Sequence, residues 1–318
     1  MARESLTKNR QSEDTIGKMV DKIFSPLKLK HYKELTEGYF NVAYEVELSD
    51  GKEAILKIAP KKDVRIMTHE KNIMSSEVRA MRTVAQSGTI PVPQIYGYDD
   101  SCTLCDSPYF FMEKLRGSSL DTIKDTLTQE QIENIYSETG KIICAVNHIS
   151  GPCFGYPGQP EYQGKEWYPV FCKMVKAEID DAKKGNVDLK IPTDELLGRL
   201  ERDKDFFDEV KEPKLVHWDC WDGNIFVDNG KLTGIIDWER CLWADPLMEV
   251  GFRTYSPNPA FQRGYGLEML TDKQLRRALW YDIYFMILAA SECEYRQYET
   301  MDMYHWSTDI LVRQFSNI

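Results

Sequence analysis

The amino-acid sequence predicts an α+β protein with two lobes, a small β-rich N-terminal lobe and a larger α-helical C-terminal lobe. Segments with strand-like alternation and many β-branched or aromatic residues gather before residue 115, and helical periodicity dominates after it. The length of 318 residues is enough for about two domains of ordinary size. We therefore expect one lobe over residues 1–115 and the other over residues 116–318.

The N-terminal lobe is expected to consist of a small sheet with one inserted helix. The turn "SDG" at 49–51 separates two strand-like segments, which predicts a β-hairpin. The helical segment spaces its apolar residues near the helical period and reaches Gly88, where a helix can end. The predicted elements are strands at 39–48, 52–59 and 108–115 and a helix at 72–88.

The C-terminal lobe is predicted to contain helices packed around a hairpin. The segment "TQEQ" at 128–131 has the pattern of a capping box, which predicts the start of a helix. The dipeptide Asn229-Gly230 between two strand-like segments strongly favours a two-residue hairpin turn. The predicted elements are helices at 128–149, 166–183 and 193–210, a strand at 214–219, the hairpin at 224–238, and further helices after residue 271.

The net charge of −11 argues against some classes of partner. Nucleic acids and anionic membranes bind basic surfaces, so neither is expected. No run of about 18 apolar residues could span a bilayer, and the polar N-terminus lacks the apolar core of a signal peptide. We expect a soluble cytoplasmic protein, either monomeric or homodimeric. The charge is compatible with a cationic small-molecule substrate, although most acidic proteins are acidic simply for solubility.

Two short stretches, "VHWDCWDGN" at 216–224 and "IIDWE" at 235–239, concentrate polar groups that have no hydrophobic reason to gather. The predicted hairpin returns Asn224 and Asp237 to the same end of its strands, and Asp219 lies on the loop just ahead. Amide and carboxylate oxygens suit a hard cation such as Mg²⁺. A further acid can accept a proton from an attacking hydroxyl. Phosphoryl transfer needs this combination, although each acid could also simply cap a loop.

The first lobe offers the positive charge that phosphoryl transfer requires over the phosphates. Lys57 interrupts the apolar strand "AILKIA", so its side chain either leaves the sheet edge or points into a cleft. Glu77, in the following helix, could pair with Lys57. The ordinary alternatives are a lysine that extends to the surface and a solvated charge on a helix.

The motif H-x-D-x₄-N followed by I-D-W, with a lysine strand and a glutamate helix upstream, resembles the aminoglycoside phosphotransferase/choline kinase family. Members share the bilobal architecture of protein kinases, so the resemblance implies a protein-kinase-like fold. The similarity extends from about Tyr39 to the C-terminal helices and is most specific between Leu215 and Val250. Residues 1–115 would then be the nucleotide-binding lobe, and residues 116–318 the catalytic and substrate-binding lobe.

The resemblance implies a role for each matching residue. Asp219 would be the catalytic base, and Asn224 and Asp237 would bind Mg²⁺. Lys57 would hold the α- and β-phosphates of ATP or GTP and pair with Glu77. The remaining nucleotide contacts would be Met112 at the back of the pocket, the main chain of Glu113 and Leu115 at the purine, and an apolar floor of Phe226 and Ile236.

Some positions depart from the protein-kinase pattern. Gly38 stands alone in the phosphate-covering turn "TEGYFNVAY", where protein kinases have three glycines, and "DWE" replaces "DFG". No "APE" segment follows, which argues against a protein substrate. We expect His217 to orient the catalytic loop, and Asp245 and Glu249 to brace the structure around it.

The acceptor is the open part of the prediction. Glu239, Glu292, Glu294 and Tyr295 could form an acidic, aromatic wall that holds ammonium groups by charge and cation–π contact. The alternative is ordinary helix packing, which we expect for Trp280, Tyr284 and Trp306. The leading substrate class is an aminoglycoside-like amino sugar, which would make the protein an antibiotic-resistance enzyme. The alternatives are a metabolic kinase of choline, ethanolamine or a sugar derivative, and a catalytically silent nucleotide-binding protein.

Overall fold

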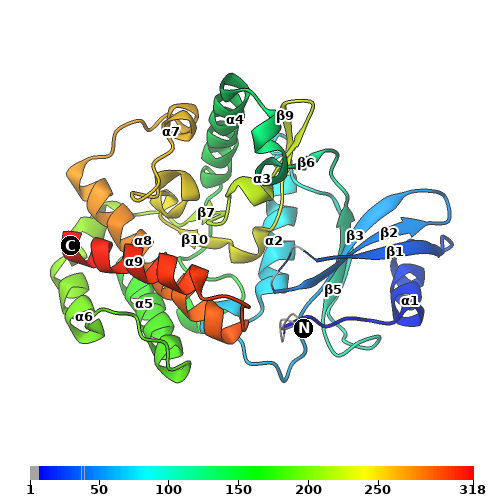
Figure 1. Cartoon of the computed structure of the whole chain (residues 1–318), viewed down its shortest axis with the longest axis horizontal. Helices are drawn as coiled ribbons and strands as arrows, with labels where there is room; N and C mark the ends of the chain where they lie inside the picture. Colours follow the sequence, from blue (N-terminus) through cyan, green and yellow to red (C-terminus); the bar gives the residue numbers. More distant parts are fainter. Residues whose placement is uncertain (1–6, 37, 39) are drawn as a thin grey trace.

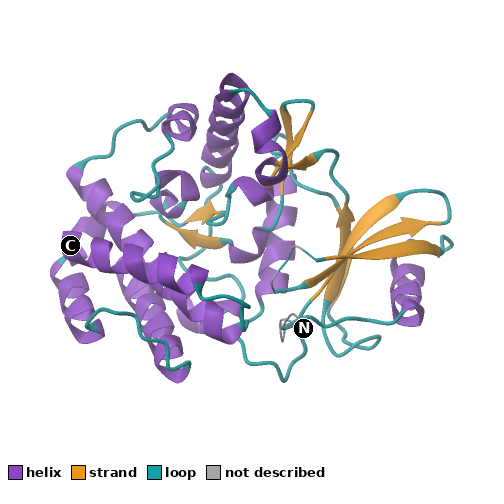
Figure 2. Cartoon of the chain, viewed as in Figure 1, coloured by secondary structure: helices purple, strands orange, loops and turns teal. Residues whose placement is uncertain are grey.

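The computed structural model describes residues 7–36, 38 and 40–318. Two lobes are visible in Figure 1, a sheet-rich lobe on the right and a larger helical lobe on the left. Figure 2 shows that most strands belong to the first lobe and most helices to the second. The predicted α+β architecture with a small N-terminal β-rich lobe is therefore confirmed.

The N-terminal lobe is built on one antiparallel five-stranded sheet with the order β1-β2-β3-β5-β4. Its helix α1 (Glu13–Phe24) buries Ile16, Met19 and Val20 against the sheet. The strands are β1 (Leu29–Leu35), β2 (Val42–Leu48), β3 (Glu53–Ile58), β4 (Ile95–Asp99) and β5 (Tyr109–Glu113).

Residues alternate between the two faces of this sheet, and the alternation decides where Lys57 points. Leu56 and Ile58 of β3 belong to the small core beneath α1. The opposite face of the sheet contributes to the main core, to which α2 (Ile73–Ala85) adds Val78 and Met81. Because Lys57 lies between Leu56 and Ile58 in the strand, its side chain leaves on the α2 side, toward the helical lobe.

The predicted strands and helix of this lobe are confirmed as β2, β3, β5 and α2, and β2 and β3 form the predicted hairpin. The elements α1, β1 and β4 were not among those predicted from the sequence. Glu37 and Tyr39, in the turn expected to cover the phosphates, lie outside the described residues, as do residues 1–6.

The helical lobe follows the predicted order closely. The capping box of Thr128 and Gln131 is present at the start of α4. The helix expected to reach residue 210 ends at Arg202 and continues as a 3₁₀ helix over Lys204–Glu209. The helices are α3 (Leu120–Ile123), α4 (Gln129–Asn147), α5 (Trp167–Lys184), α6 (Thr193–Arg202), α7 (Pro259–Tyr265), α8 (Asp272–Tyr295) and α9 (Asp302–Asn317). No helix among the described residues is long and apolar enough to cross a membrane.

Two small sheets position the loops between the lobes. Strand β7 (Lys214–Val216) pairs with β10 (Leu242–Ala244), and β6 (Ser118–Ser119) pairs with β8 (Ile225–Asp228), which pairs in turn with β9 (Lys231–Ile235). At the tip of the β8–β9 hairpin, Asn229 and Gly230 have φ angles of 50° and 74°. Positive φ at both positions matches the predicted two-residue turn.

Candidate active site

A buried ion pair joins β3 to α2. The Nζ atom of Lys57 lies 2.7 Å from Oε1 of Glu77, and the Glu77 side chain is fully buried. Burial alone would lower the pKa of Lys57, but Asp237, Glu77 and Glu239 outweigh it and hold that pKa above its usual value. Lys57 therefore stays charged in the closed space between the lobes.

Asp237 brings the end of the β8–β9 hairpin to the same lysine. Its Oδ1 lies 2.7 Å from Nζ of Lys57. Its φ of 62° is in the left-handed region, which aspartate tolerates better than most residues. Burial would raise the pKa of Asp237, but the adjacent Lys57 charge outweighs burial and keeps the pKa below its usual value. A charged carboxylate is thus fixed beside the charged lysine.

Asp219 and Asn224 face one another across the loop between β7 and β8. The side-chain nitrogen of Asn224 donates to the Asp219 carbonyl at 2.8 Å and approaches Oδ2 of Asp219 at 3.3 Å. Burial raises the pKa of Asp219 to about 6, and the positive charge of Arg240 opposes the rise. The side-chain nitrogen of Asn224 is hydrogen-bonded to Asp219, so the side-chain oxygen of Asn224 is the atom that could bind a cation.

His217 and Glu249 hold in place the loop over residues 217–224, which is the candidate catalytic loop. Burial lowers the pKa of His217 to about 4, so the ring is neutral at physiological pH. Its Nε2 donates to the Ile236 carbonyl at 3.1 Å, and its Nδ1 accepts from the Asp219 main-chain N–H at 3.2 Å. Glu249 accepts from the main-chain N–H groups of His217 and Trp218. Both residues thus orient the loop, as expected for them.

The donor set at this place fits a divalent cation. Carboxylate oxygens of Glu77, Asp237 and Glu239 lie within 4.8 Å of one another. Among the described residues, Lys57 is the cation hydrogen-bonded to this group. Burial raises the pKa of Glu77 and of Glu239, and a bound cation would favour the charged forms of both acids. Carboxylate and amide oxygens are the ligands that Mg²⁺ prefers, and Asp237 and Asn224 supply one of each kind.

The phosphotransferase enzyme family model matches residues 31–278, which include β3, α2, the catalytic loop and the β8–β9 hairpin. The chain belongs to this family. A curated relative that it matches is hygromycin-B 4-O-kinase of Escherichia coli, at 24% identity over 176 residues. The match covers 52% of this chain and 47% of the relative, so the chain spans about half the length of that protein.

Solved structures share the fold of this phosphotransferase at low sequence identity. A thermostable aminoglycoside phosphotransferase in complex with AMP-PNP and hygromycin B has a TM-score of 0.67 at 16% identity, covering 95% of this chain and 98% of that one. A putative fructosamine-3-kinase from Thermobifida fusca has a TM-score of 0.62 at 16% identity, covering 95% and 100%. The predicted protein-kinase-like fold is therefore confirmed.

The residues predicted to contact the nucleotide lie on or next to β5 and the β8–β9 hairpin. Met112 is buried on the α2 side of β5, while Phe226 and Ile236 are only half-buried. A Cβ added to Gly234 would lie 2.6 Å from Cδ1 of Leu115, so this glycine lets the chain after β5 approach the hairpin closely. The main-chain N–H of Glu113 donates to the Gln94 carbonyl.

The four residues expected in an acidic, aromatic wall lie in different surroundings. Glu239 belongs to the carboxylate group around Lys57, whereas Glu294 is exposed. Tyr295 is buried and donates from its hydroxyl to the Asp181 carbonyl. Glu292 is buried with its charge already matched by arginines. The structure therefore does not gather these four residues into one surface.

Arg240 was not among the predicted site residues, and it links Glu292 to the loop that carries Asp219. Its Nη2 lies 2.5 Å from Oε1 of Glu292, and its Nε lies 3.8 Å from Oδ2 of Asp219. Arg296 also contacts Oε1 of Glu292, at 3.0 Å. A buried row of alternating charges thus ends at Asp219. The one signal in the sequence was an arginine directly after "IIDWE", among acids that need a cation.

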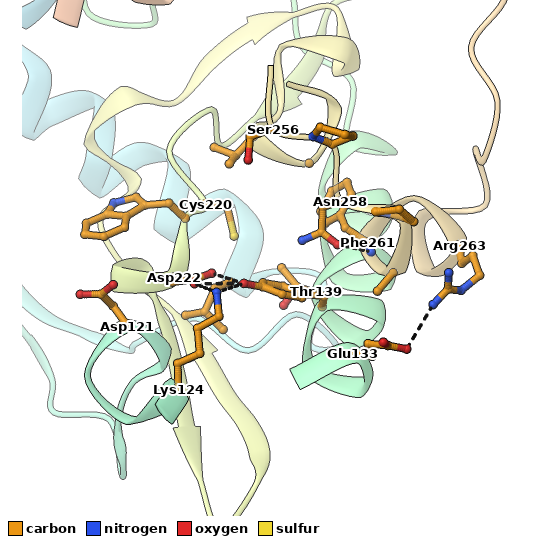
Figure 3. A pocket seen from close by; sticks show the side chains of 18 of the residues that line it. Asp121, Lys124, Glu133, Thr139, Cys220, Asp222, Ser256, Asn258, Phe261 and Arg263 are labelled. Carbon is orange, nitrogen blue, oxygen red and sulfur yellow. Dashed lines mark hydrogen bonds and ion pairs between the residues drawn. The ribbon is translucent and has the colours of Figure 1, made fainter. Parts of the chain in front are cut away.

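A cavity of about 730 Å³ opens beside the catalytic loop, where Cys220, Trp221 and Asp222 form part of its wall (Figure 3). Asp222 is held by Nζ of Lys124 at 2.6 Å and by the Tyr136 hydroxyl at 2.9 Å. The remaining walls come from α3, from the first turns of α4 and from the start of α7, and they include Asp121, Glu133, Asn258, Phe261 and Arg263. No sequence pattern pointed to this cavity, because its walls come from four separate segments.

Proposed function

We propose that this phosphotransferase transfers the γ-phosphoryl group of ATP or GTP to a hydroxyl group of a small molecule that carries amino groups. The observation that best supports it is the junction at Lys57, whose ammonium contacts both Glu77 and Asp237. A protein that only packs its core has no reason to bury two carboxylates around one lysine, because the desolvation is costly. In kinases, a lysine–glutamate pair of this kind positions the lysine over the nucleotide phosphates.

The residues of the chain would divide the reaction among them. Lys57 would bind the phosphates of the nucleotide, and Asp237 with Asn224 would hold Mg²⁺, which when bound neutralises charge on the phosphate oxygens. Asp219 would accept a hydrogen bond from the acceptor hydroxyl and take its proton as the phosphoryl group is transferred. Arg240 would keep the Asp219 carboxylate in position and lower the cost of its charge.

The cavity beside the catalytic loop is our candidate for the acceptor site. Its volume of about 730 Å³ lies within the range of about 300–1,000 Å³ that is usual for small-molecule pockets. Asp121 and Glu133 bring negative charge to it, although Glu133 lies 3.7 Å from Nη2 of Arg263, and Trp221 is 48% exposed at its wall. Carboxylates and an indole face both attract ammonium groups. An aminoglycoside-like amino sugar therefore fits best, which would make the protein an antibiotic-resistance enzyme of the cytoplasm.

A second candidate is a metabolic kinase that acts on choline, ethanolamine or a sugar derivative. The observation that favours a sugar derivative is the structural likeness to a putative fructosamine-3-kinase, which covers the whole of that chain. An amino-substituted sugar would use the same acids and the same indole. A catalytically silent nucleotide-binding protein is disfavoured because the base, the lysine and the two metal-binding side chains are all present.

A coupled assay of nucleoside diphosphate release tests this proposal. The protein, ATP or GTP and Mg²⁺ would be combined with aminoglycosides, fructosamine, choline, ethanolamine or free sugars, and phosphorylated products would be identified by mass spectrometry. We expect turnover with at least one amino sugar, and a rate lower by about 10²- to 10⁴-fold with the Asp219→Asn variant. Turnover with choline or fructosamine alone would favour the metabolic kinase. Nucleotide binding without any phosphorylated product would indicate the silent protein.

A further inference from the structure

The segment before α1 is fixed across the N-terminal lobe. The side-chain nitrogen of Asn9, a buried residue, donates to the Ala59 carbonyl at 3.2 Å and to Oγ of Ser107 at 3.0 Å. The main-chain N–H of Gln11 donates to the Tyr44 hydroxyl at 3.0 Å. These contacts tie the segment to β2 and to the ends of β3 and β5, although it comes from the start of the chain.

Directly before these anchors, Lys8 reaches the turn that joins β1 to β2. Its Nζ donates to the Asn41 carbonyl at 2.8 Å and lies 3.7 Å from the position that a Cβ of Gly38 would occupy. Burial lowers the pKa of Lys8, and the carboxylates of Glu34 and Glu239 oppose that shift. This turn is the one that the family resemblance places over the nucleotide phosphates. The tethered segment thus delivers an ammonium group to it.

Asn41 connects Lys8 to the catalytic centre. While its carbonyl accepts from Lys8, its side-chain nitrogen donates to Oε2 of Glu239 at 2.8 Å. Glu239 belongs to the same cluster of carboxylates as Asp237, the candidate metal ligand. Asn41 therefore links Lys8 to the carboxylates beside the proposed phosphate site. Lys57 approaches the same carboxylates from β3.

The turn itself offers little to bind phosphates. Protein kinases cover the phosphates with a loop that contains three glycines, and here Gly38 is the only glycine between β1 and β2. Resting on the proposed function, we propose that Lys8 is a second lysine ligand of the nucleotide phosphates. On binding, its ammonium would exchange the neutral Asn41 carbonyl for an anionic phosphate oxygen, a stronger hydrogen-bond acceptor.

Contact between Lys8 and the phosphates can be distinguished from a purely structural role of Lys8 by the affinities for different nucleotides. The contribution of Lys8 must depend on the number of phosphates in the ligand, because AMP offers less charge at the turn than ADP or ATP. Loss of a turn-anchoring hydrogen bond would instead loosen the site for all three nucleotides. The three affinities therefore separate the two roles.

The test compares Lys8→Met and Lys8→Arg with a matched Lys18→Met control, in which an exposed lysine of α1 is replaced. Dissociation constants for ATP, ADP and AMP with Mg²⁺ would be measured by calorimetry, with thermal unfolding to verify folding. We expect Lys8→Met to weaken ATP binding by about 10- to 100-fold, the usual loss for a charged hydrogen bond. AMP binding should be unchanged, and Lys8→Arg should retain most of the ATP affinity.

Unchanged ATP affinity in Lys8→Met, or an equal loss for ATP and AMP, would overturn the role of Lys8 and leave the proposed function intact. Absence of any nucleotide binding by the unmodified protein would refute the proposed function itself, and the role of Lys8 with it.

Discussion

The ammonium group of Lys57 lies 2.7 Å from the Glu77 carboxylate, and this pair joins β3, the central strand of the small lobe, to helix α2. Burying such a pair costs about as much desolvation energy as the attraction returns, so stability alone does not explain it. Its effect is to fix a charged lysine between the two lobes, next to Asp237.

Replacing Glu77 by Gln tests that effect. The variant keeps the size of the side chain but removes the charge that holds Lys57. We expect kcat/KM for ATP to fall by about 10- to 100-fold, the loss typical of a charged hydrogen bond. Steady-state kinetics would measure the change, with Glu130→Gln, an exposed glutamate of α4, as control. Equal kinetics in both variants would remove Glu77 from the site.

Local patterns were sufficient to predict much of this arrangement. The β8–β9 hairpin was predictable because Asn229-Gly230 leaves the chain few other turns, and its geometry then returns Asn224 and Asp237 to one end. The apolar strand alone left open whether Lys57 leaves the sheet edge or points into a cleft, and the family resemblance favoured its pairing with Glu77. Helix α1 and strand β1 were missed, although α1 has a Ser12 cap, because their apolar positions are few and spread through a polar segment.

Contacts between residues distant in the sequence could not be predicted in the same way. Glu292 was expected to face a substrate, but it is buried against Arg240 and Arg296, and such pairing depends on how α8 packs. The cavity beside Trp221 likewise depends on where α7 packs on α4. Neither feature has a period or a spacing in the sequence that would reveal it.

Replacing Asp237 by Ala should abolish the effect of Mg²⁺ on nucleotide binding. In the unmodified protein, ATP should bind about tenfold or more tightly with Mg²⁺ than with EDTA, because one charge-assisted contact is worth roughly that factor. In Asp237→Ala the two affinities should be equal. Calorimetric titrations would measure them, and a persistent preference for Mg²⁺ would show that Asp237 is not a ligand.

Arg240 should set the pH at which activity is lost in acid. Asp219 must be deprotonated to accept a proton, and burial raises its pKa to about 6, so kcat/KM should fall as the pH drops below about 6. Arg240 favours the charged form. Replacing Arg240 by Met should therefore raise the pKa further and move the acid limb of the pH profile toward neutral pH. An unmoved limb would mean that Asp219 is not the group that titrates.

Glu292 should act through Arg240 rather than on the substrate. In Glu292→Gln we expect kcat to fall by about tenfold, since a buried charged contact is lost, while KM for the acceptor changes little. Glu294→Gln, at an exposed position on the same helix, is the matched comparison. A raised acceptor KM with normal kcat in Glu292→Gln would instead make Glu292 a substrate ligand.

The most direct test of the account is Asp219→Asn, measured for acceptor phosphorylation and for Mg-ATP binding in the same preparation. We expect kcat to fall by about 10²- to 10⁴-fold, the usual contribution of a general base, while the dissociation constant of Mg-ATP stays close to that of the unmodified protein. Turnover that survives the substitution, or nucleotide binding that disappears with it, would contradict the assignment of Asp219 as the base.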